Sequence, residues 1–306
     1  MGWLSAERAL ACAGMLASDL DVIVLGSTTP NEVCPNTASA IKNKLRANSA
    51  AAIDLNSACT SWLYGVAMIS DMIKAGSIET GMVIGAERLS LGLDWNKRES
   101  CCLFGDGAGA VILTKSHTEL GFIASRISCV PDSREFLAIP KWGIQPAVHT
   151  NDLHLSMNFD GAAIFKRAVK SMSLDCQFVL DRAGLTIADV DIFIPHQANI
   201  RIINAVGSKL GIDPSKTVVT IDKFGNTSAA SIPISLCEAL KGDVIKGGDT
   251  ILIASFGAGL SCGAALLKWG TSTKNTVDTH FSIPPFQGDV RDLLADSFSY
   301  HGINYN

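Results

Sequence analysis

The sequence predicts an α/β protein made of two copies of one unit, because it repeats itself and because short apolar runs alternate with helical stretches. The clearest repeat joins residues 10–31, LACAGMLASDLDVIVLGSTTPN, to residues 180–199, LDRAGLTIADVDIFIPHQAN. In both segments an amphipathic helix ends on Ala-Gly, an Asp follows seven residues after that Gly, and an apolar strand comes next. The offset of 170 residues is too long for a solenoid repeat.

Two weaker repeats follow in the same order. Ala-Ile-Asp at 52–54 comes shortly before Ser-Ala-Cys-Thr, and Thr-Ile-Asp at 220–222 comes shortly before Gly-Asn-Thr-Ser, an offset of 168. The segment FGDGAGAVIL at 104–113 is matched by FGAGLSCGAALL at 256–267. Because three repeats in one order rarely arise by chance, we interpret them as a duplication.

The expected strands are short apolar or β-branched runs, which is typical of strands buried on both faces: Val22–Leu25, Ala51–Leu55, Gly81–Ile84, Ala110–Leu113, Ile192–Ile194, Val218–Ile221 and Ile251–Ala254. The expected helices between them are Thr60–Ala75, Ile164–Ala183, Ile200–Leu210 and Ser231–Leu240. This alternation predicts helices layered on sheets. After Trp269 the pattern stops, and we expect residues 270–306 to be an appended tail with one short helix, from Asp289 to Asp296.

Composition excludes several classes of protein. A net charge of −4 gives no sign of a nucleic-acid partner. The longest uncharged run, residues 251–267, contains three glycines and makes a poor membrane span, so no membrane association is expected. The nine cysteines form no Cys-x-x-Cys pair, which argues against a metal site, and the N-terminus lacks the pattern of a signal peptide. These features predict reduced thiols in the cytoplasm.

Three residues stand where chemistry is expected. Cys59 lies at the junction of a predicted strand and helix, where backbone N–H groups favour a thiolate and should lower its pKa. His196 follows a buried strand directly, and Asn226 sits in a glycine turn with an uncharged donor. Each has a structural alternative: a buried core cysteine, a structural histidine and an ordinary helix N-cap. Since the repeat places Cys59 and Asn226 at nearly equivalent positions, we expect the three to meet in one pocket as nucleophile, base and hydrogen-bond donor.

These residues carry a resemblance to a known family. The four segments Ser-Ala-Cys-Thr, Pro-His-Gln-Ala-Asn-Ile-Arg-Ile, Gly-Asn-Thr-Ser-Ala-Ala-Ser and Phe-Gly-Asp-Gly-Ala-Gly-Ala resemble the signature motifs of β-ketoacyl-acyl carrier protein synthase III, in family order between residues 5 and 269. A Cys-His-Asn set distinguishes this family from the elongating synthases, which use Cys-His-His, and from thiolases, which use a second cysteine. The resemblance implies the duplicated five-layer αβαβα thiolase fold. Its first half would span residues 1–118, its second half residues 119–269, and the tail residues 270–306.

The resemblance also implies an activity. Cys59 would take an acyl group from acyl-CoA, and malonyl-acyl carrier protein would then lose CO2 and attack the acyl-cysteine, with His196 and Asn226 stabilising the enolate. The backbone around Cys59 and the loop Gly257-Ala258-Gly259 would hold the acyl oxyanion, although Gly257 and Gly259 could equally be turn glycines. No cofactor is implied, since the CoA thioester is a substrate.

Further positions carry over by the same resemblance. Arg98 would lie near the CoA adenine, unless it is a plain surface arginine, and Phe256 would lie beside the cysteine. Lys166 and Arg201 would meet the acidic carrier protein. The family is homodimeric, and Cys34 would then close the acyl pocket of the partner subunit, where its small side chain leaves room for a longer chain.

The chain departs from the family at its start. About fifty residues that the family usually carries there, including the first strand of the first half, are expected to be missing. Two alternatives to a synthase III therefore stay open: a related acyltransferase of secondary metabolism, and an inactive homologue that acts as a partner subunit.

Overall fold

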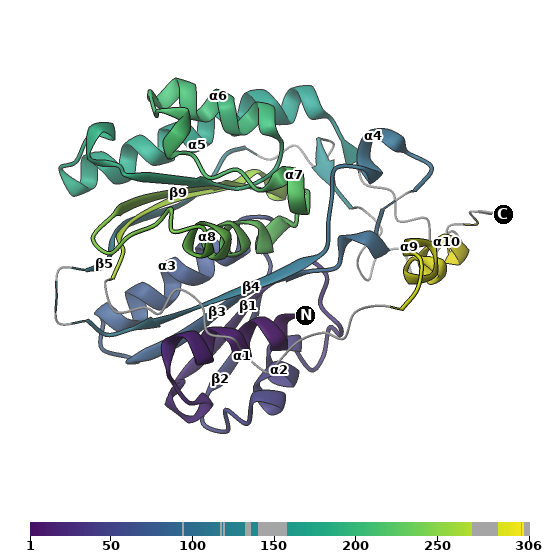
Figure 1. The fold of residues 1–306 in the computed structure, drawn as a ribbon, viewed down its shortest axis with the longest axis horizontal. Coiled ribbons are helices and arrows are strands. Elements are labelled where there is room, and N and C mark those ends of the chain that lie inside the picture. The colour runs from purple at the N-terminus through teal and green to yellow at the C-terminus, as the bar shows by residue number, and fades with distance from the viewer. Residues whose placement is uncertain are drawn as a thin grey trace.

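A computed structural model describes residues 1–93, 95–116, 118, 120–131, 136–139, 158–270, 287–300 and 302 of the chain. These residues fold into five stacked layers, in the order helices, sheet, helices, sheet, helices (Figure 1). The expected αβαβα architecture is therefore confirmed.

The first sheet has the strand order β2-β1-β3-β4, with β3 and β4 antiparallel and the other pairs parallel. Its strands are β1 (Val22–Gly26), β2 (Ala51–Leu55), β3 (Thr80–Glu87) and β4 (Gly107–Thr114). Two helices pack against this sheet from outside, α1 (Gly2–Ala13) and α2 (Thr37–Leu45).

The second sheet has the order β5-β10-β9-β8, in which β8 and β9 are parallel and β10 is antiparallel to both β9 and β5. Its strands are β5 (Gly121–Cys129), β8 (Ile192–Pro195), β9 (Thr250–Phe256) and β10 (Ser261–Lys268). The long helix α5 (Gly161–Ala183) packs on its outer face, and α6 (Ile200–Leu210) packs on α5.

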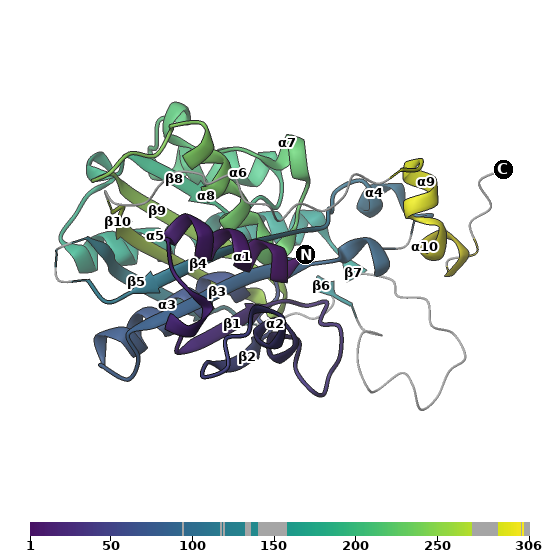
Figure 2. The same ribbon diagram turned by 60° about the horizontal axis from the view of Figure 1, so that its bottom comes forward.

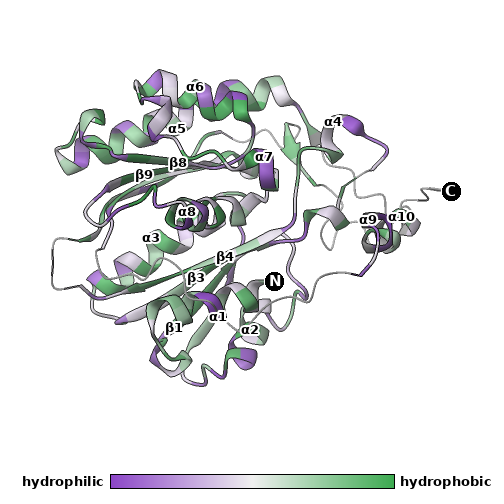
Figure 3. Ribbon diagram, viewed as in Figure 1, coloured by the Kyte–Doolittle hydropathy of each residue, from purple (hydrophilic) through white to green (hydrophobic). Residues whose placement is uncertain are grey.

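The central layer consists of α3 (Ser61–Lys74) and α8 (Ser231–Lys241), which both contact strands of both sheets. Buried residues of this layer and of the facing strands form one hydrophobic cluster. In Figure 3 the ribbon of β9 is largely coloured as hydrophobic, whereas that of α7 (Ile221–Phe224) includes hydrophilic residues. The remaining short elements are α4 (Arg98–Cys101), β6 (Leu137–Ala138), β7 (Asn158–Phe159), α9 (Val290–Leu293), α10 (Ala295–Tyr300) and 3-10 turns that include η6 (Ser228–Ala230) and η7 (Ala258–Leu260).

The duplication is visible in matching details. Gly14 and Gly184, which end α1 and α5, have φ values of 65° and 66°. Asp21 accepts the backbone N–H of Thr80 at 2.9 Å, and Asp191 accepts that of Thr250 at 2.9 Å. An aspartate at the equivalent position of each half therefore links β1 to β3 and β8 to β9.

The second repeat was placed wrongly. Residues 52–54 lie in β2, whereas their expected counterpart, residues 220–222, lies at the start of α7. The expected strand Val218–Ile221 does not form, and only the preceding residue, Thr217, makes an isolated bridge, to Phe193. The side chain of Gln197 explains this, because it bonds Val218 O, Thr220 N and Ile221 N and so occupies backbone groups that a strand would pair.

The helix starts of the two halves correspond at the same offset of 170 residues as the first repeat. Ala58 and Ser228 have nearly equal φ values, 51° and 49°, just before the starts of α3 and α8 at Ser61 and Ser231. The counterpart of Cys59 is therefore Ala229, and neither Thr227 nor Asn226.

The two sheets differ beyond the antiparallel pair of strands that they share. In the second sheet β5 pairs with β10, but within the described residues no strand pairs with the outer edge of β4, which corresponds to β10. The sequence did not predict β5, because GFIASRISC mixes polar and apolar residues. No helix among the described residues is long and apolar enough to cross a membrane.

The C-terminal tail was predicted in part. Its helical stretch is divided into α9 and α10, which lie at the same end of the molecule as α4 (Figure 2). The ring of Phe298 meets that of Trp95 edge to face at 5.5 Å. Residues 271–286 of the tail lie outside the described residues.

Candidate active site

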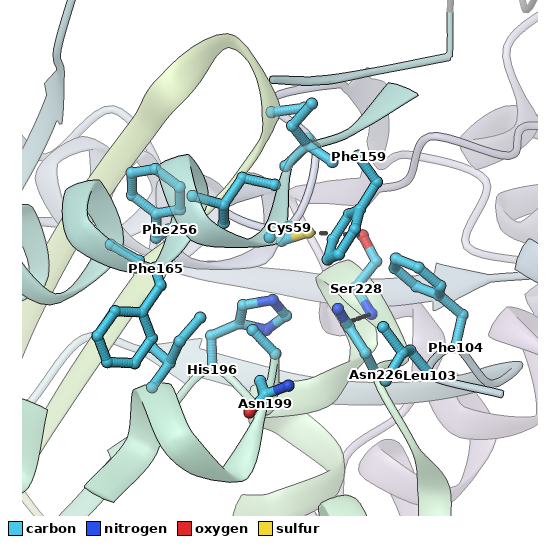
Figure 4. A pocket seen from close by; sticks show the side chains of 18 of the residues that line it. Cys59, Leu103, Phe104, Phe159, Phe165, His196, Asn199, Asn226, Ser228 and Phe256 are labelled. Atoms are coloured by element: carbon cyan, nitrogen blue, oxygen red, sulfur yellow. Dashed lines mark hydrogen bonds between the residues drawn. The ribbon is translucent and has the colours of Figure 1, made fainter. Parts of the chain in front are cut away.

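One cavity of about 590 Å³ brings the three expected catalytic residues together. Cys59 comes from the start of α3, His196 from the end of β8 and Asn226 from the turn after α7 (Figure 4). Most other lining residues are apolar, among them Leu103, Phe104, Phe159, Phe165 and Phe256. An apolar cavity with a few converging polar groups is the usual form of a ligand site.

The turn before α3 fixes the position of Cys59. The hydroxyl of Thr60 donates to Ser57 O and that of Ser61 donates to Ala58 O, both at 2.6 Å. The Cys59 Sγ accepts a hydrogen bond from the Ser228 hydroxyl at 3.4 Å. The position of the Cys59 side chain is therefore fixed by contacts from both halves of the chain.

Burial raises the pKa of the Cys59 thiol to about 11. The hydrogen bond from Ser228 and the backbone N–H of Cys59 itself lower this pKa, and the charge of Glu87 raises it. The expectation that the helix start would lower the pKa was wrong, because loss of solvent outweighs the nearby N–H groups. The sulfur is therefore a thiol at neutral pH and must lose its proton when it reacts.

His196 is neutral and oriented. Burial lowers the pKa of its imidazole to about 4. Its Nδ1 lies 2.6 Å from the Ser231 hydroxyl, and that oxygen also accepts the N–H of Gln197 at 3.5 Å. In the tautomer in which the Ser231 hydroxyl donates to Nδ1, the imidazole proton lies on Nε2. Nε2–H is then a donor for a substrate.

Asn226 presents a second donor. Its backbone N–H donates to Leu103 O at 2.8 Å, and its Oδ1 accepts the N–H of Ser228 at 2.9 Å. Because the amide oxygen is engaged in this way, the Nδ2 group is the part of the side chain left for a ligand. Two uncharged N–H donors beside a thiol can stabilise an oxyanion or enolate.

Comparisons with known proteins agree with this geometry. A family profile described as 3-oxoacyl-[acyl-carrier-protein (ACP)] synthase III matches residues 53–131, and the profile of that enzyme's C-terminal part matches residues 180–269. A curated relative, β-ketoacyl-[acyl-carrier-protein] synthase III 2 of Vibrio vulnificus (strain YJ016), is 43% identical over 292 residues, which cover 95% of this chain and 81% of the relative. The chain belongs to the 3-oxoacyl-[acyl-carrier-protein] synthase III family.

Solved structures of the synthase III family have the same fold. That of 3-oxoacyl-[acyl-carrier-protein] synthase III from Aquifex aeolicus VF5 matches with a TM-score of 0.81 and 40% identity, over 88% of this chain and 83% of that one. The enzyme from Pseudomonas aeruginosa PAO1 matches with a TM-score of 0.82 and 33% identity, over 90% and 83% of the two chains. The chain is thus a condensing acyltransferase with the duplicated thiolase fold.

The other site residues expected of a synthase III have different places. Phe256 and Ala258 line the cavity. The N–H of Gly257 donates to Ser261 O at 2.9 Å and is not left for an oxyanion, so the role of Gly257 is steric: an added Cβ would lie 2.9 Å from Cys59 N. Gly259 has a φ of 70° and open space around it, which is typical of a turn glycine.

Charged residues lie at the rim. Lys166 on α5 and Arg201 on α6 are exposed and line the cavity. Arg98 and Cys34 are also exposed but are not among the described lining residues of this cavity. Any role of these two in binding would lie at the outer approach or across a subunit interface.

Several lining residues were not singled out from the sequence. Ser228, which touches Cys59, stands two residues after Asn226 in the same motif, so the motif itself offered a signal. Leu137 and Phe159 come from β6 and β7, whose two-residue strands have no recognisable periodicity. Thr28 reaches the cavity from the loop after β1.

Proposed function

We propose that the chain condenses an acyl group from acyl-CoA with malonyl-acyl carrier protein, and so initiates fatty acid synthesis. The observation that carries this proposal is the position of a thiol beside two neutral N–H donors in one apolar cavity. The names and identity of the relatives support it, so neither of the alternatives, a secondary-metabolism acyltransferase or an inactive homologue, is needed.

In the first step the Cys59 sulfur attacks the thioester carbonyl of acyl-CoA. The C–S bond to CoA breaks, the acyl group stays on Cys59, and the proton of the thiol leaves with the CoA sulfur. The apolar walls favour the acyl chain and exclude water, which would otherwise hydrolyse the new thioester.

In the second step the malonyl carboxylate leaves as CO2, and its bonding electrons form an enolate. The enolate oxygen is stabilised by Nε2–H of His196 and the Nδ2 group of Asn226. The carbanion attacks the acyl carbonyl and expels the Cys59 thiolate, which takes up a proton. Neutral donors suit this step, because they stabilise the enolate without stabilising the departing carboxylate as strongly as a cation would.

The decarboxylation step should not depend on the protonation of His196 in the usual range. A histidine whose pKa is lowered stays neutral until the pH falls towards that lower value, here about 4. We therefore expect a constant rate of malonyl decarboxylation from about pH 8 to about pH 5.5, whereas an unperturbed histidine would charge near pH 6.5. A loss of rate centred near that ordinary value, in enzyme that remains folded, would contradict the neutral-donor assignment.

Exposed basic residues are suited to binding the two substrates. Lys166 and Arg201 are suited to the acidic carrier protein, and Arg98 to the phosphates or base of CoA at the outer approach. The nine free cysteines suit a reducing compartment, and we place the enzyme in the cytoplasm.

We propose that two copies form a homodimer at the side where α3 lies between the two open sheet edges. β2 and β5 are edge strands, and α3 packs against β5 and against β1, the neighbour of β2. Exposed apolar side chains lie on these elements and on α5: Ile53 is 37% exposed, Ile127 52% and Leu174 55%. Such a face, with unpaired strand edges, favours burial against a second copy.

The homodimer gives Cys34 its role. Its loop is exposed and its neighbour Val33 is 86% exposed, as expected of a segment that enters the acyl pocket of the partner. We expect the parent to prefer acyl chains longer than acetyl, and Cys34→Phe to reject them while acetyl still fits. Since one methylene is worth about 1–3 kcal/mol, a ring should shift the preference by more than one step in chain length.

The measurement is kcat/KM for acetyl-, butyryl-, hexanoyl- and octanoyl-CoA with malonyl-acyl carrier protein. It also tests the proposed function, which fails if no acyl-CoA supports condensation. A parent that prefers acetyl-CoA, or an octanoyl-to-acetyl ratio that Cys34→Phe leaves unchanged, would contradict the pocket assignment. Light scattering should give the same dimer mass for both proteins.

A further inference from the structure

Glu87 is a buried carboxyl group without a cation. It ends β3 and is 1% exposed. Its oxygens accept the N–H and hydroxyl of Thr28 at 3.0 and 2.9 Å and the hydroxyl of Thr29 at 2.8 Å. None of the ion pairs in the described part of the chain includes it. Burial raises its pKa, and these hydrogen bonds lower it.

Ser228 joins Glu87 to the nucleophile. Its hydroxyl donates to Cys59 Sγ at 3.4 Å (Figure 4), and its side chain is also among the groups that lower the pKa of Glu87. Because the hydroxyl has one proton, it can donate to only one of the two at a time, and when it donates to Glu87 its oxygen can accept the S–H of Cys59. The residue is held in the left-handed region, with a φ of 49°, where a non-glycine residue is strained. β3 packs directly against η6, since a Cβ on Gly85 would lie 2.3 Å from Ala229 O. The strained backbone at Ser228 therefore places its hydroxyl between the thiol of Cys59 and the carboxylate of Glu87.

If Glu87 stayed ionised throughout the reaction, its negative charge would hinder the formation of a thiolate at Cys59. The negative charge of Glu87 opposes ionisation of Cys59, whereas a carboxylate that accepts the thiol proton becomes neutral as the thiolate forms. The other titratable groups among the described lining residues are poor acceptors. Lys166 and Arg201 are cations, and both nitrogens of His196 are occupied, one by Ser231 and one by its own proton.

We propose that Ser228 and Glu87 form a proton relay that activates Cys59 for acylation. As the sulfur attacks the acyl-CoA carbonyl, the Ser228 oxygen takes the thiol proton and passes its own proton to Glu87, which becomes a carboxylic acid. When the bond to CoA breaks, Glu87 returns the proton along the same route to the CoA sulfur. One thioester is exchanged for another, and no proton is gained or lost.

The relay rests on the proposed function and can be separated from it by half-reactions. Ser228→Ala and Glu87→Gln should each slow acylation of Cys59 by acyl-CoA about 10²-fold, the usual contribution of general acid–base catalysis. Both should decarboxylate malonyl-carrier protein at the parent rate. Ser228→Ala keeps the backbone N–H that orients Asn226. Acylation is followed by intact mass in rapid-quench experiments, and decarboxylation by release of CO2.

A second readout does not need the natural substrates. Site-resolved alkylation by iodoacetamide should slow at Cys59 in both variants, while the exposed Cys102 keeps its rate. Glu79→Gln is the matched control, because it removes an exposed carboxylate just before the same strand and should change nothing.

The outcomes separate the possibilities. Parent-like acylation and alkylation of Cys59 in Ser228→Ala and Glu87→Gln would overturn the relay. A parallel loss of decarboxylation would overturn it too, because Glu87 would then only support the site. If Glu87→Gln does not fold, Ser228→Ala decides alone. If the parent takes no acyl group from any acyl-CoA, the proposed function fails, and the alkylation rates still test the relay.

Discussion

Replacing Cys59 with Ala should abolish covalent acylation of the protein by acyl-CoA and lower condensation by roughly 10⁴-fold or more, as expected for loss of a nucleophile. Cys59 is the only cysteine among the described lining residues of the cavity, so it is the only one of them that can form a thioester. Decarboxylation of malonyl-carrier protein should continue, since His196 and Asn226 remain in place.

Intact mass spectrometry after addition of acyl-CoA measures the adduct directly. Cys102→Ala is the matched control, because it removes an exposed thiol outside the described lining of the cavity and should leave one adduct per chain. A persistent adduct in Cys59→Ala, or loss of condensation in Cys102→Ala, would show that the nucleophile is elsewhere.

Removing the side chain of His196 or Asn226, the two N–H donors, should impair decarboxylation and spare acyl transfer, the opposite of the result expected for Cys59→Ala. In His196→Ala and Asn226→Ala, acyl transfer to Cys59 should be largely retained, while malonyl decarboxylation falls by about 10²-fold or more for each lost donor. The physical reason is that both N–H groups face the enolate, whereas neither is needed to remove the proton of Cys59.

A third variant, for which we expect an intermediate rate of decarboxylation, tests the role of His196 further. Ser231→Ala keeps the imidazole but removes the hydroxyl that holds Nδ1, so its decarboxylation rate should lie between those of the parent and His196→Ala. Equal loss of acyl transfer and decarboxylation in His196→Ala would mean instead that the histidine is the base for the thiol.

The sequence was sufficient for the parts of the molecule that depend on local pattern. Short apolar runs identified β1, β2, β3, β4, β8 and β9, and the glycines at 14 and 184 marked the ends of two helices. The meeting of Cys59, His196 and Asn226 in one cavity could be predicted because each lies in a motif at the end of a strand or the start of a helix.

Features that depend on long-range packing could not be predicted in this way. The pKa of Cys59 rises because distant segments bury it, and Glu87 approaches Cys59 only through Ser228, 141 residues further along the chain. The segment 218–221 has a strand-like sequence, but the side chain of Gln197 occupies its backbone. In each case the deciding contact is made by a residue remote in sequence or by the loss of solvent.

The equivalence of the two helix starts has a consequence for stoichiometry. At matching positions one half carries Ala58-Cys59 and the other carries Ser228-Ala229, so one copy supplies the sulfur and the other the hydroxyl that touches it. Ala229 is 1% exposed and lies against Gly85, which leaves no second place for an acyl group. We therefore expect one acyl group per chain, with the two similar halves contributing different groups to a single site.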